Sequence, residues 1–298
     1  KEYRRQRQMC IRDRSATDRQ TVMKSLWTSA RLRLVAAVWI VFNGFFPVLW
    51  ILLTSLKPET ELVQKPITWW PHRPTLMHYA HAFTEQPLLH YLGNSLIVAS
   101  LSTVLSLTVA TGAAYAIARL NLRFRQWILT AIVASSMFPL ITLLVPIFEI
   151  MRSLGLLNSY TALILPYTVL NLPVCTLVLV SFFQSIPRDL ENAAMIDGCS
   201  RLGTLWRIVL PLAAPGVFTA GILAFVNSWD EFLLALSLNA SAAMRTAPVG
   251  IAMYQGEYTF PWPLISAALI VTIIPVALLI AFFQEWVVGG LTQGGLKG

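Results

Sequence analysis

The sequence E-N-A-A-M-I-D-G at residues 191–198, followed by I-V-L-P at residues 208–211, lies in a polar, basic interruption between two long apolar segments. This interruption, residues 184–212, has the residue order of two short helices joined by a tight turn. Ser185 is a suitable N-cap and Pro187 suits an early helical position, so a first helix is expected to follow them. Gly198 is expected to end that helix, because glycine adopts the left-handed conformation in which many helices terminate.

The second helix of the interruption is predicted to begin after Ser200 and to end at Leu210. Pro211 cannot donate a hydrogen bond to a helical ladder, and it pushes the residue before it toward extended geometry. One face of this helix is expected to carry four apolar residues at helical spacing, namely Leu202, Leu205, Trp206 and Val209. Such an amphipathic helix pair is either a docking element for a soluble partner or a connector on a surface, and the spacing alone favours neither.

Composition places the chain among membrane proteins. Apolar residues make up 56% and charged residues 12% of the 298 residues, which excludes a disordered chain and fits poorly with a soluble domain. The predicted fold class is an all-α membrane protein with six transmembrane helices, at about 34–56, 91–117, 127–150, 162–183, 213–238 and 263–288. Residues 1–22 are expected to be a disordered or artefactual N-terminal extension, and residues 23–298 a single membrane domain.

The net charge of +8 is distributed unevenly over this topology. With the N-terminus in the cytoplasm, only five of the 22 basic residues lie outside, namely Lys57, Lys65, Arg73, Arg152 and Arg245. An excess of basic residues on the inner side is a topology signal and does not indicate a nucleic-acid-binding face. The chain is therefore expected to be a multi-pass protein of the bacterial plasma (inner) membrane, with both termini cytoplasmic, in contact with lipid and with no nucleic acid.

Polar residues within the predicted spans indicate a path for a solute, because an acidic group at mid-bilayer costs about 2.5 to 3.5 kcal/mol on insertion scales. Helical spacing puts Asn227 beside Asp230 and Glu231, so these three groups are expected to face a water-filled cavity together. Trp229 would either offer its ring to the solute or pack against a neighbouring helix. Asn171, in the fourth span, would line the same path. The competing interpretations are polar contacts that hold helices together and a proline kink.

The sequence carries no motif for chemistry of its own. It lacks a G-x-x-x-x-G-K-[ST] phosphate-binding loop, so any ATP must be bound by another chain. It also lacks G-x-S-x-G and H-E-x-x-H motifs, so the chain is not expected to be an enzyme. The three cysteines are far apart in the predicted topology. Of the four histidines, His78 and His81 could share a helical face, which is a weak case for a metal site. No metal site and no cofactor are expected in this chain.

The interruption at residues 184–212 resembles the coupling loop of the membrane subunits of binding-protein-dependent ABC importers. The resemblance rests on the alanines at 193 and 194, a glycine four residues later, nine intervening residues and then I-x-L-P. Within these importers, the chain is similar to the second permease subunit of carbohydrate uptake systems of the maltose, trehalose and glycerol-phosphate type. The family usually has glutamate directly before the paired alanines. Here that position is Asn192, so an amide would hydrogen-bond where a salt bridge is usual.

The resemblance implies the type I ABC importer permease fold over residues 23–298, with residues 184–212 as a cytoplasmic coupling-helix loop. It assigns contact with an ATPase to nine residues, namely Glu191, Asn192, Ala193, Ala194, Asp197, Gly198, Ile208, Leu210 and Pro211. It also implies three partners: a second permease subunit in a heterodimer, a dimer of ATP-binding ABC subunits that carries ATP and Mg, and an extracytoplasmic solute-binding protein.

The expected function is therefore half of the translocation path of an ATP-driven sugar importer. A disaccharide such as trehalose or maltose is the expected solute, because polar and aromatic residues suit an uncharged, hydroxylated molecule and no basic residue lies within the spans to meet a phosphate. The alternative function is an ion-coupled secondary transporter in which Asp230 and Glu231 bind the proton or cation.

Overall fold

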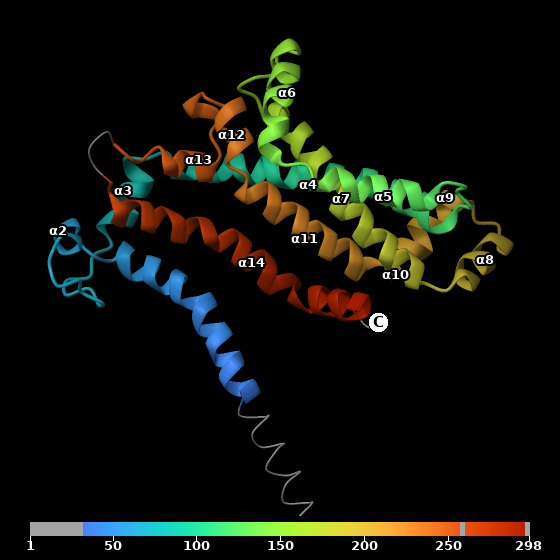
Figure 1. The fold of residues 1–298 in the computed structure, drawn as a ribbon, viewed down its shortest axis with the longest axis horizontal. Helices are drawn as coiled ribbons and strands as arrows, with labels where there is room; N and C mark the ends of the chain where they lie inside the picture. The colour runs from blue at the N-terminus through green and yellow to red at the C-terminus, as the bar shows by residue number, and fades with distance from the viewer. Residues whose placement is uncertain (1–31, 257–259, 296–298) are drawn as a thin grey trace, which may run out of the picture.

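The computed structural model describes residues 32–256 and 260–295, with side chains as far as residue 284, so the predicted extension at residues 1–22 lies outside the described part. Within that part, every regular element is helical (Figure 1). The elements are the N-terminal span Leu32–Ser55, α2 Glu59–Leu62, α3 Met77–Thr84, α4 Leu88–Arg119, α5 Arg125–Ser136, α6 Leu140–Ser153, α7 Tyr160–Ser185, α8 Arg188–Ile196, α9 Arg201–Thr204, the π-helix η1 Leu205–Val209, α10 Leu210–Leu212, α11 Ala214–Asp230, α12 Leu233–Leu238, the 3₁₀ turn η2 Ala242–Met244, α13 Ala247–Ala252 and α14 Trp262–Gly295.

Four of these helices form the body of the protein. α4 packs against α7 and α11, and α11 packs in turn against α14 (Figure 1). Small residues such as Ala110 and Ala220 are fully buried at these contacts. At Gly216 on α11, an added Cβ atom would lie 2.3 Å from the ring of Phe182 on α7. Small residues favour helix association in a bilayer because they let backbones approach closely, where lipid and leucine are equally apolar.

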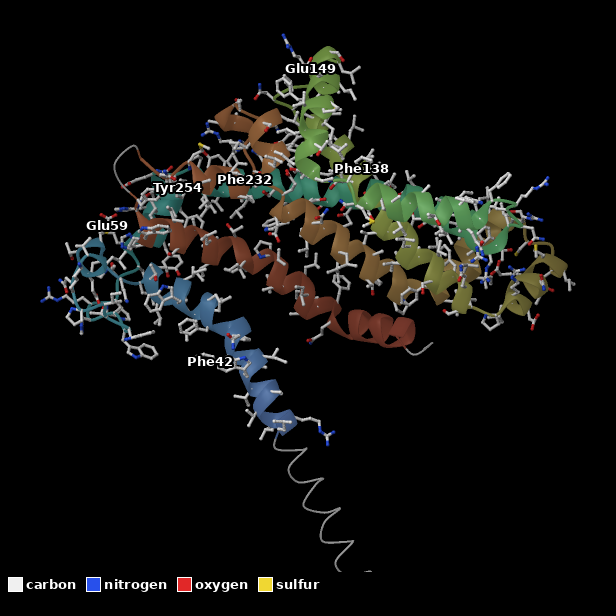
Figure 2. The ribbon with its side chains drawn as sticks, in the orientation of Figure 1. Phe42, Glu59, Phe138, Glu149, Phe232 and Tyr254 are labelled. Carbon is white, nitrogen blue, oxygen red and sulfur yellow. The ribbon has the colours of Figure 1, made fainter. Side chains whose placement is uncertain are left out.

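The N-terminal span stands apart from this bundle. It leaves the body at an angle, and Phe42 on it lies well away from the other helices (Figures 1 and 2). No residue of its most apolar 18-residue window is buried. Such a continuous apolar surface must be covered by lipid or by another chain.

The segment after the N-terminal span folds back onto the end of that helix. The buried Lys57 donates a hydrogen bond from Nζ to the carbonyl of Thr68, and its ammonium lies 5.1 Å from the centroid of the Trp50 ring. The buried ring of His78 on α3 hydrogen-bonds through Nε2 to the carbonyl of Lys57 over 3.1 Å. Because a carbonyl only accepts, Nε2 carries the proton in this contact. Burial lowers the pKa of His78 below its ordinary value.

Two of the predicted spans are broken helices. Where the sequence indicates a span at 127–150, α5 and α6 meet at an angle of 91° around residues 137–139. Pro139 takes the N-cap position of α6 in extended geometry, because it has no N–H to continue the ladder of α5. Where a span is expected at 213–238, α11 ends at Asp230 and the short helix α12 follows after a turn. Four helices are long and apolar enough to cross a membrane. The number rises to six if two bent pairs, α5 with α6 and Arg201–Leu212 with α11, are each one span.

Candidate functional site

The first helix of residues 184–212, hereafter the coupling loop, is α8. α7 continues to Ser185, whose hydroxyl donates to the carbonyl of Phe182, so the prediction that Ser185 caps the following helix is wrong. Pro187 instead takes the N-cap position of α8 in extended geometry. At the other end, Gly198 has a φ of 90°, a left-handed conformation that reverses the chain after α8, as the sequence predicts.

The second helix begins as expected but ends later. Ser200 caps it by accepting a hydrogen bond from the N–H of Gly203 over 3.1 Å. The helix then widens into the π-helix η1 and continues through Pro211 to Leu212, with Leu210 in helical geometry (φ −62°, ψ −46°). The prediction that Leu210 is extended is therefore wrong. In a π-helix the bonds run from residue i+5 to residue i, so the wider turn gives the proline ring room that a regular α-helix lacks.

The apolar face predicted for the second helix is divided. Leu205 and Val209 are buried against the end of the bundle, whereas Leu202 and Trp206 are 69% and 64% exposed. The four apolar residues therefore do not share one environment, because the helix contacts the bundle along one side only. Ile196, at the end of α8, is 86% exposed. The coupling loop thus presents several large apolar side chains to its surroundings, of which Ile196, Leu202 and Trp206 are the most exposed.

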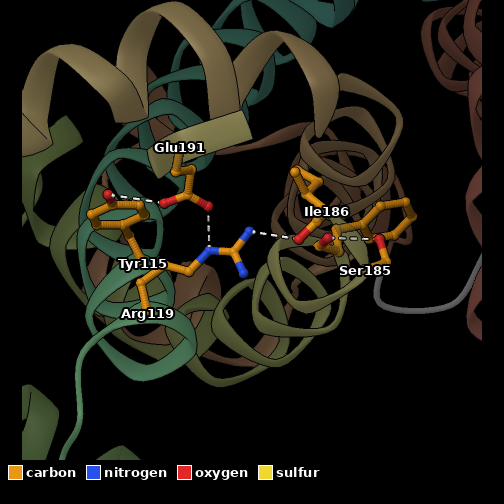
Figure 3. A network of polar contacts seen from close by, with 6 residues as sticks. Tyr115, Arg119, Ser185, Ile186 and Glu191 are labelled. Atoms are coloured by element: carbon orange, nitrogen blue, oxygen red, sulfur yellow. Dashed lines mark hydrogen bonds and ion pairs between the residues drawn. The ribbon is translucent and has the colours of Figure 1, made fainter. Parts of the chain in front are cut away.

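Glu191 points inward, toward the end of α4. Its Oε1 lies 2.5 Å from Nε of Arg119, although the N–H is not aligned as a hydrogen bond, and both side chains are 7% exposed. Tyr115 donates to Oε2 of Glu191 over 3.3 Å, and the guanidinium of Arg119 also donates to the carbonyl of Ile186 over 3.0 Å (Figure 3). This cluster of Glu191, Arg119, Tyr115 and Ile186, hereafter the latch, ties α8 and the end of α7 to the last turn of α4.

The other residues that the resemblance assigns to ATPase contact lie in three environments. Asn192, Ala193, Asp197, Gly198 and Pro211 are exposed, Ile208 and Leu210 are half-buried, and Ala194 is buried under α8. Exposure leaves the first group accessible to a partner. Ala194 instead allows α8 to lie close to the bundle.

The candidate path residues do not form one cluster. Asn171 on α7 donates to Oγ of Ser228 over 2.9 Å and accepts from Asn227 over 2.8 Å. Ser102 on α4 donates to the same Ser228 oxygen over 3.1 Å. These bonds join α4, α7 and α11 in the middle of the bundle, and only Asn227 is exposed. Asn171 and Ser228 therefore satisfy each other between helices, which corresponds to the interpretation as polar contacts that hold helices together.

Trp229 lies in the packed interior. It is 2% exposed, and its ring stacks on that of Phe225 with centroids 5.6 Å apart. Of the two roles considered for this ring, the structure has the packing role. Ala99 on α4 and Leu279 on α14 belong to the same cluster, so Trp229 joins three helices.

Glu231 caps a helix. It leaves α11 in extended geometry (φ −67°, ψ 128°), and its two carboxylate oxygens accept from the backbone N–H groups of Leu234 and Ala235 at the start of α12. Tyr167 on α7 donates to the same carboxylate over 2.5 Å. Asp230 is exposed and has no hydrogen-bond or ion-pair partner among the described residues. The predicted common face of Asn227, Asp230 and Glu231 is wrong, because the helix ends between Asp230 and Glu231.

No group of three or more His, Cys, Asp or Glu side chains in the described part of the chain is placed to hold a metal ion. Residues 103–293 match the family described as "Binding-protein-dependent transport system inner membrane component". The chain belongs to this family. Its members are membrane components of ABC importers, so this chain is a permease and a multi-pass inner-membrane protein, and the family places the ATPase on a separate subunit.

Relatives cover nearly the whole permease. It is 66% identical over 276 residues to the sulfoquinovosyl glycerol transport system permease protein SmoH of Agrobacterium fabrum, which covers 93% of this chain and 97% of the relative. It is 36% identical to the trehalose/maltose transport system permease protein MalG of Thermococcus litoralis, with 94% and 99% covered. A chain of a bacterial ABC transporter involved in alginate import superposes with a TM-score of 0.75 at 20% identity, over 86% of this chain and 95% of that one.

These similarities confirm the type I permease fold and the identification as a carbohydrate-family ABC permease, and nothing in them supports an ion-coupled transporter. Sequence reasoning missed several partners of the candidate residues, among them Arg119, Tyr115 and Tyr167. In the sequence, Arg119 is only one of the basic residues expected on the cytoplasmic side. Arg119 lies in the last turn of an apolar helix, at the same predicted membrane side as the coupling loop. That position is the sequence signal that could have indicated a pairing with an acidic residue of the coupling loop.

Proposed function

We propose that the chain forms half of the translocation path of an ATP-driven sugar importer and docks on an ATPase through the coupling loop. The latch carries this proposal. It holds α8 to the end of α4 by the buried Glu191, while Asn192, Asp197 and Ile196 lie on the exposed side. An element that is fixed on one side and exposed on the other can transmit force from a partner to the membrane helices as a rigid unit.

The proposed partners are a second permease subunit, a dimer of ATP-binding ABC subunits and an extracytoplasmic solute-binding protein. The bare N-terminal span supports the permease heterodimer, because its apolar surface is available to another membrane chain. ATP and Mg²⁺ would be held by the ABC subunits, since this sequence has no phosphate-binding loop. The excess of basic residues on the side of the predicted topology that carries the coupling loop supports cytoplasmic termini.

The proposed contribution of this chain to the solute path centres on Asn227, whose amide is exposed and oriented by Asn171. Asp230 is the second exposed polar group nearby. Trp229 and Glu231 would support this region from within, because one is packed in the interior and the other caps α12. An amide and a carboxylate suit the hydroxyl groups of a sugar.

The solute to test first is sulfoquinovosyl glycerol, because the relative named for its transport is 66% identical over 93% of this chain. The name of that solute denotes a sulfonated sugar joined to glycerol, which carries a charge that the expected disaccharides lack. No Lys or Arg lies within the predicted spans of this chain. The sulfonate would therefore be met by the solute-binding protein or by the second permease.

The decisive experiment is to extract the chain from its native membrane in mild detergent and to identify the proteins that co-purify. The complex is then reconstituted in liposomes with the solute-binding protein, and ATP hydrolysis and uptake are measured with sulfoquinovosyl glycerol and with trehalose. A second permease and an ATPase, with hydrolysis stimulated by the loaded binding protein, are the expected result. A chain that purifies alone and drives uptake from an ion gradient without ATP would refute the proposal.

A further inference from the structure

A polar cavity of about 300 Å³ lies between the end of α4 and the two helices of the coupling loop. Its polar lining includes three arginines, one carboxylate and two amides, namely Arg119, Arg188, Arg201, Glu191, Asn121 and Asn192. The carboxylate is already paired, since Glu191 forms the latch with Arg119. The cavity therefore retains two positive charges that no acidic group in its lining compensates.

These two charges belong to Arg188, in the first turn of α8, and Arg201, in the first turn of α9. Both residues are exposed, and neither side chain has a hydrogen-bond or ion-pair partner among the described residues. Isolated surface arginines are normally solvated and need no partner. Here, however, two guanidinium groups from different helices line one concave site with the amide of Asn192, and such planar donor groups match a carboxylate.

We infer that this cavity receives an acidic side chain, Asp or Glu, from the ATPase subunit that the coupling loop contacts. The inference rests on the proposed function, which places an ATPase at the coupling loop. It adds that the contacting group of the ATPase is negatively charged and that Arg188 and Arg201 bind it. The two arginines belong to the coupling loop, beyond the ends of α7 and α11, which favours a protein carboxylate over the phosphate of a lipid headgroup at the bilayer surface.

The surroundings of the cavity fit a protein partner. Ile196 and Leu202 directly follow the lining residues Met195 and Arg201 in the sequence, are 86% and 69% exposed, and would be buried when a partner docks on the coupling loop. Burial of such side chains around a charged contact excludes water from it and strengthens the charge pair. The latch supplies a rigid floor, because Glu191 and Arg119 already satisfy each other there.

The test uses the importer in nanodiscs. The permease pair is held in the nanodisc, and the affinity with which the ATPase binds it is measured at increasing KCl concentrations. The variants Arg188→Ala and Arg201→Ala are each expected to weaken binding about tenfold, because each loses one arm of a charge pair that is desolvated in the complex. The matched control is Arg207→Ala, which removes an exposed arginine of the same loop that does not line the cavity. The measurement is made in phosphatidylcholine alone and again with phosphatidylglycerol added.

Loss of affinity in both cavity variants but not in Arg207→Ala, in both lipids, supports the inference. Equal effects in all three variants would show a general positive surface and overturn it. An effect confined to nanodiscs with phosphatidylglycerol would assign the cavity to a lipid headgroup and also overturn it. If the wild-type permease pair binds no ATPase, the proposed function itself fails and this inference with it. Normal ATPase binding by the wild type and by both cavity variants would refute the inference alone.

Discussion

Replacement of Glu191 by alanine should loosen α8 from the body of the permease. The carboxylate lies 2.5 Å from Arg119, and both side chains are 7% exposed, so the substitution leaves a buried guanidinium without its counter-charge. Removal of one partner from a buried ion pair typically costs about 3 to 5 kcal/mol. Arg119 keeps the carbonyl of Ile186 at 3.0 Å, which places this case near 3 kcal/mol, or about a hundredfold change in an equilibrium constant.

Hydrogen exchange of the amides in residues 188–196 measures this cost directly, because local opening of α8 exposes them. Glu191→Ala should lower their protection about a hundredfold, and in liposomes it should reduce the solute taken up per ATP hydrolysed. The matched control is Asp189→Ala, which removes an exposed carboxylate from the first turn of the same helix. It should change protection by less than about threefold, as surface substitutions usually do.

A double-variant cycle separates the ion pair from other effects of the substitution. Arg119→Met combined with Glu191→Met should cost much less than the two single variants together, because a buried ion pair can be exchanged for apolar side chains at little cost, whereas half a pair cannot. The reasoning is refuted if the amides of α8 are as well protected from exchange in Glu191→Ala as in Asp189→Ala. It is also refuted if the two single-variant costs add.

Three further outcomes follow from the described geometry. Gly198→Val should reduce uptake per ATP hydrolysed without loss of assembly, because φ is 90° at this position and a valine there costs about 1 to 2 kcal/mol of backbone strain, while open space around the site leaves room for the side chain. Gly198→Asn should retain more activity, because asparagine tolerates the left-handed conformation better. Equal uptake by the two variants would contradict this. Gly250→Ala should destabilise the purified permease in a thermal assay, because its Cβ would lie 2.1 Å from the Tyr91 ring. Gly93→Ala on α4 has open space and should melt no lower than wild type, since alanine favours a helix more than glycine does. Equal melting of the two variants would exclude the clash. Burial depresses the pKa of His78, so the stability of residues 57–84 should be full above pH 6.5 and should decline as the pH falls below it. Amide hydrogen exchange, corrected for the intrinsic exchange rate at each pH, measures this decline. The same decline in His78→Gln would show that His78 does not cause it.

Local features of the coupling loop could be predicted because short-range geometry controls them. Gly198 reverses the chain with positive φ, and Ser200 caps the next helix, as their residue types indicate. Ser185 and Leu210 did not follow the local rules. α7 continued through Ser185, and a π-helix accommodated Pro211, so in both cases the packing of longer helices outweighed the local preference.

The candidate path residues show a second limit. Helical spacing puts Asn227, Asp230 and Glu231 on one side only if the helix continues, and α11 ends at Asp230. The carboxylate of Glu231 instead binds the first N–H groups of α12 and the hydroxyl of Tyr167, which is 64 residues away in sequence. Periodicity contains no information about such a distant donor, so the break in the helix could not be anticipated.

The sequence by itself determined the class of this protein, because long apolar segments, the uneven distribution of basic residues and the pattern of residues 191–211 are properties of the chain and need no contact to be recognised. The tertiary structure alone decided what each polar side chain does. Glu191 faces Arg119 across 72 positions, and Asn171 meets Ser228 across 57. Inside a low-dielectric bundle a buried charge or amide without a partner is costly, and the identity of its partner depends on which helices pack together.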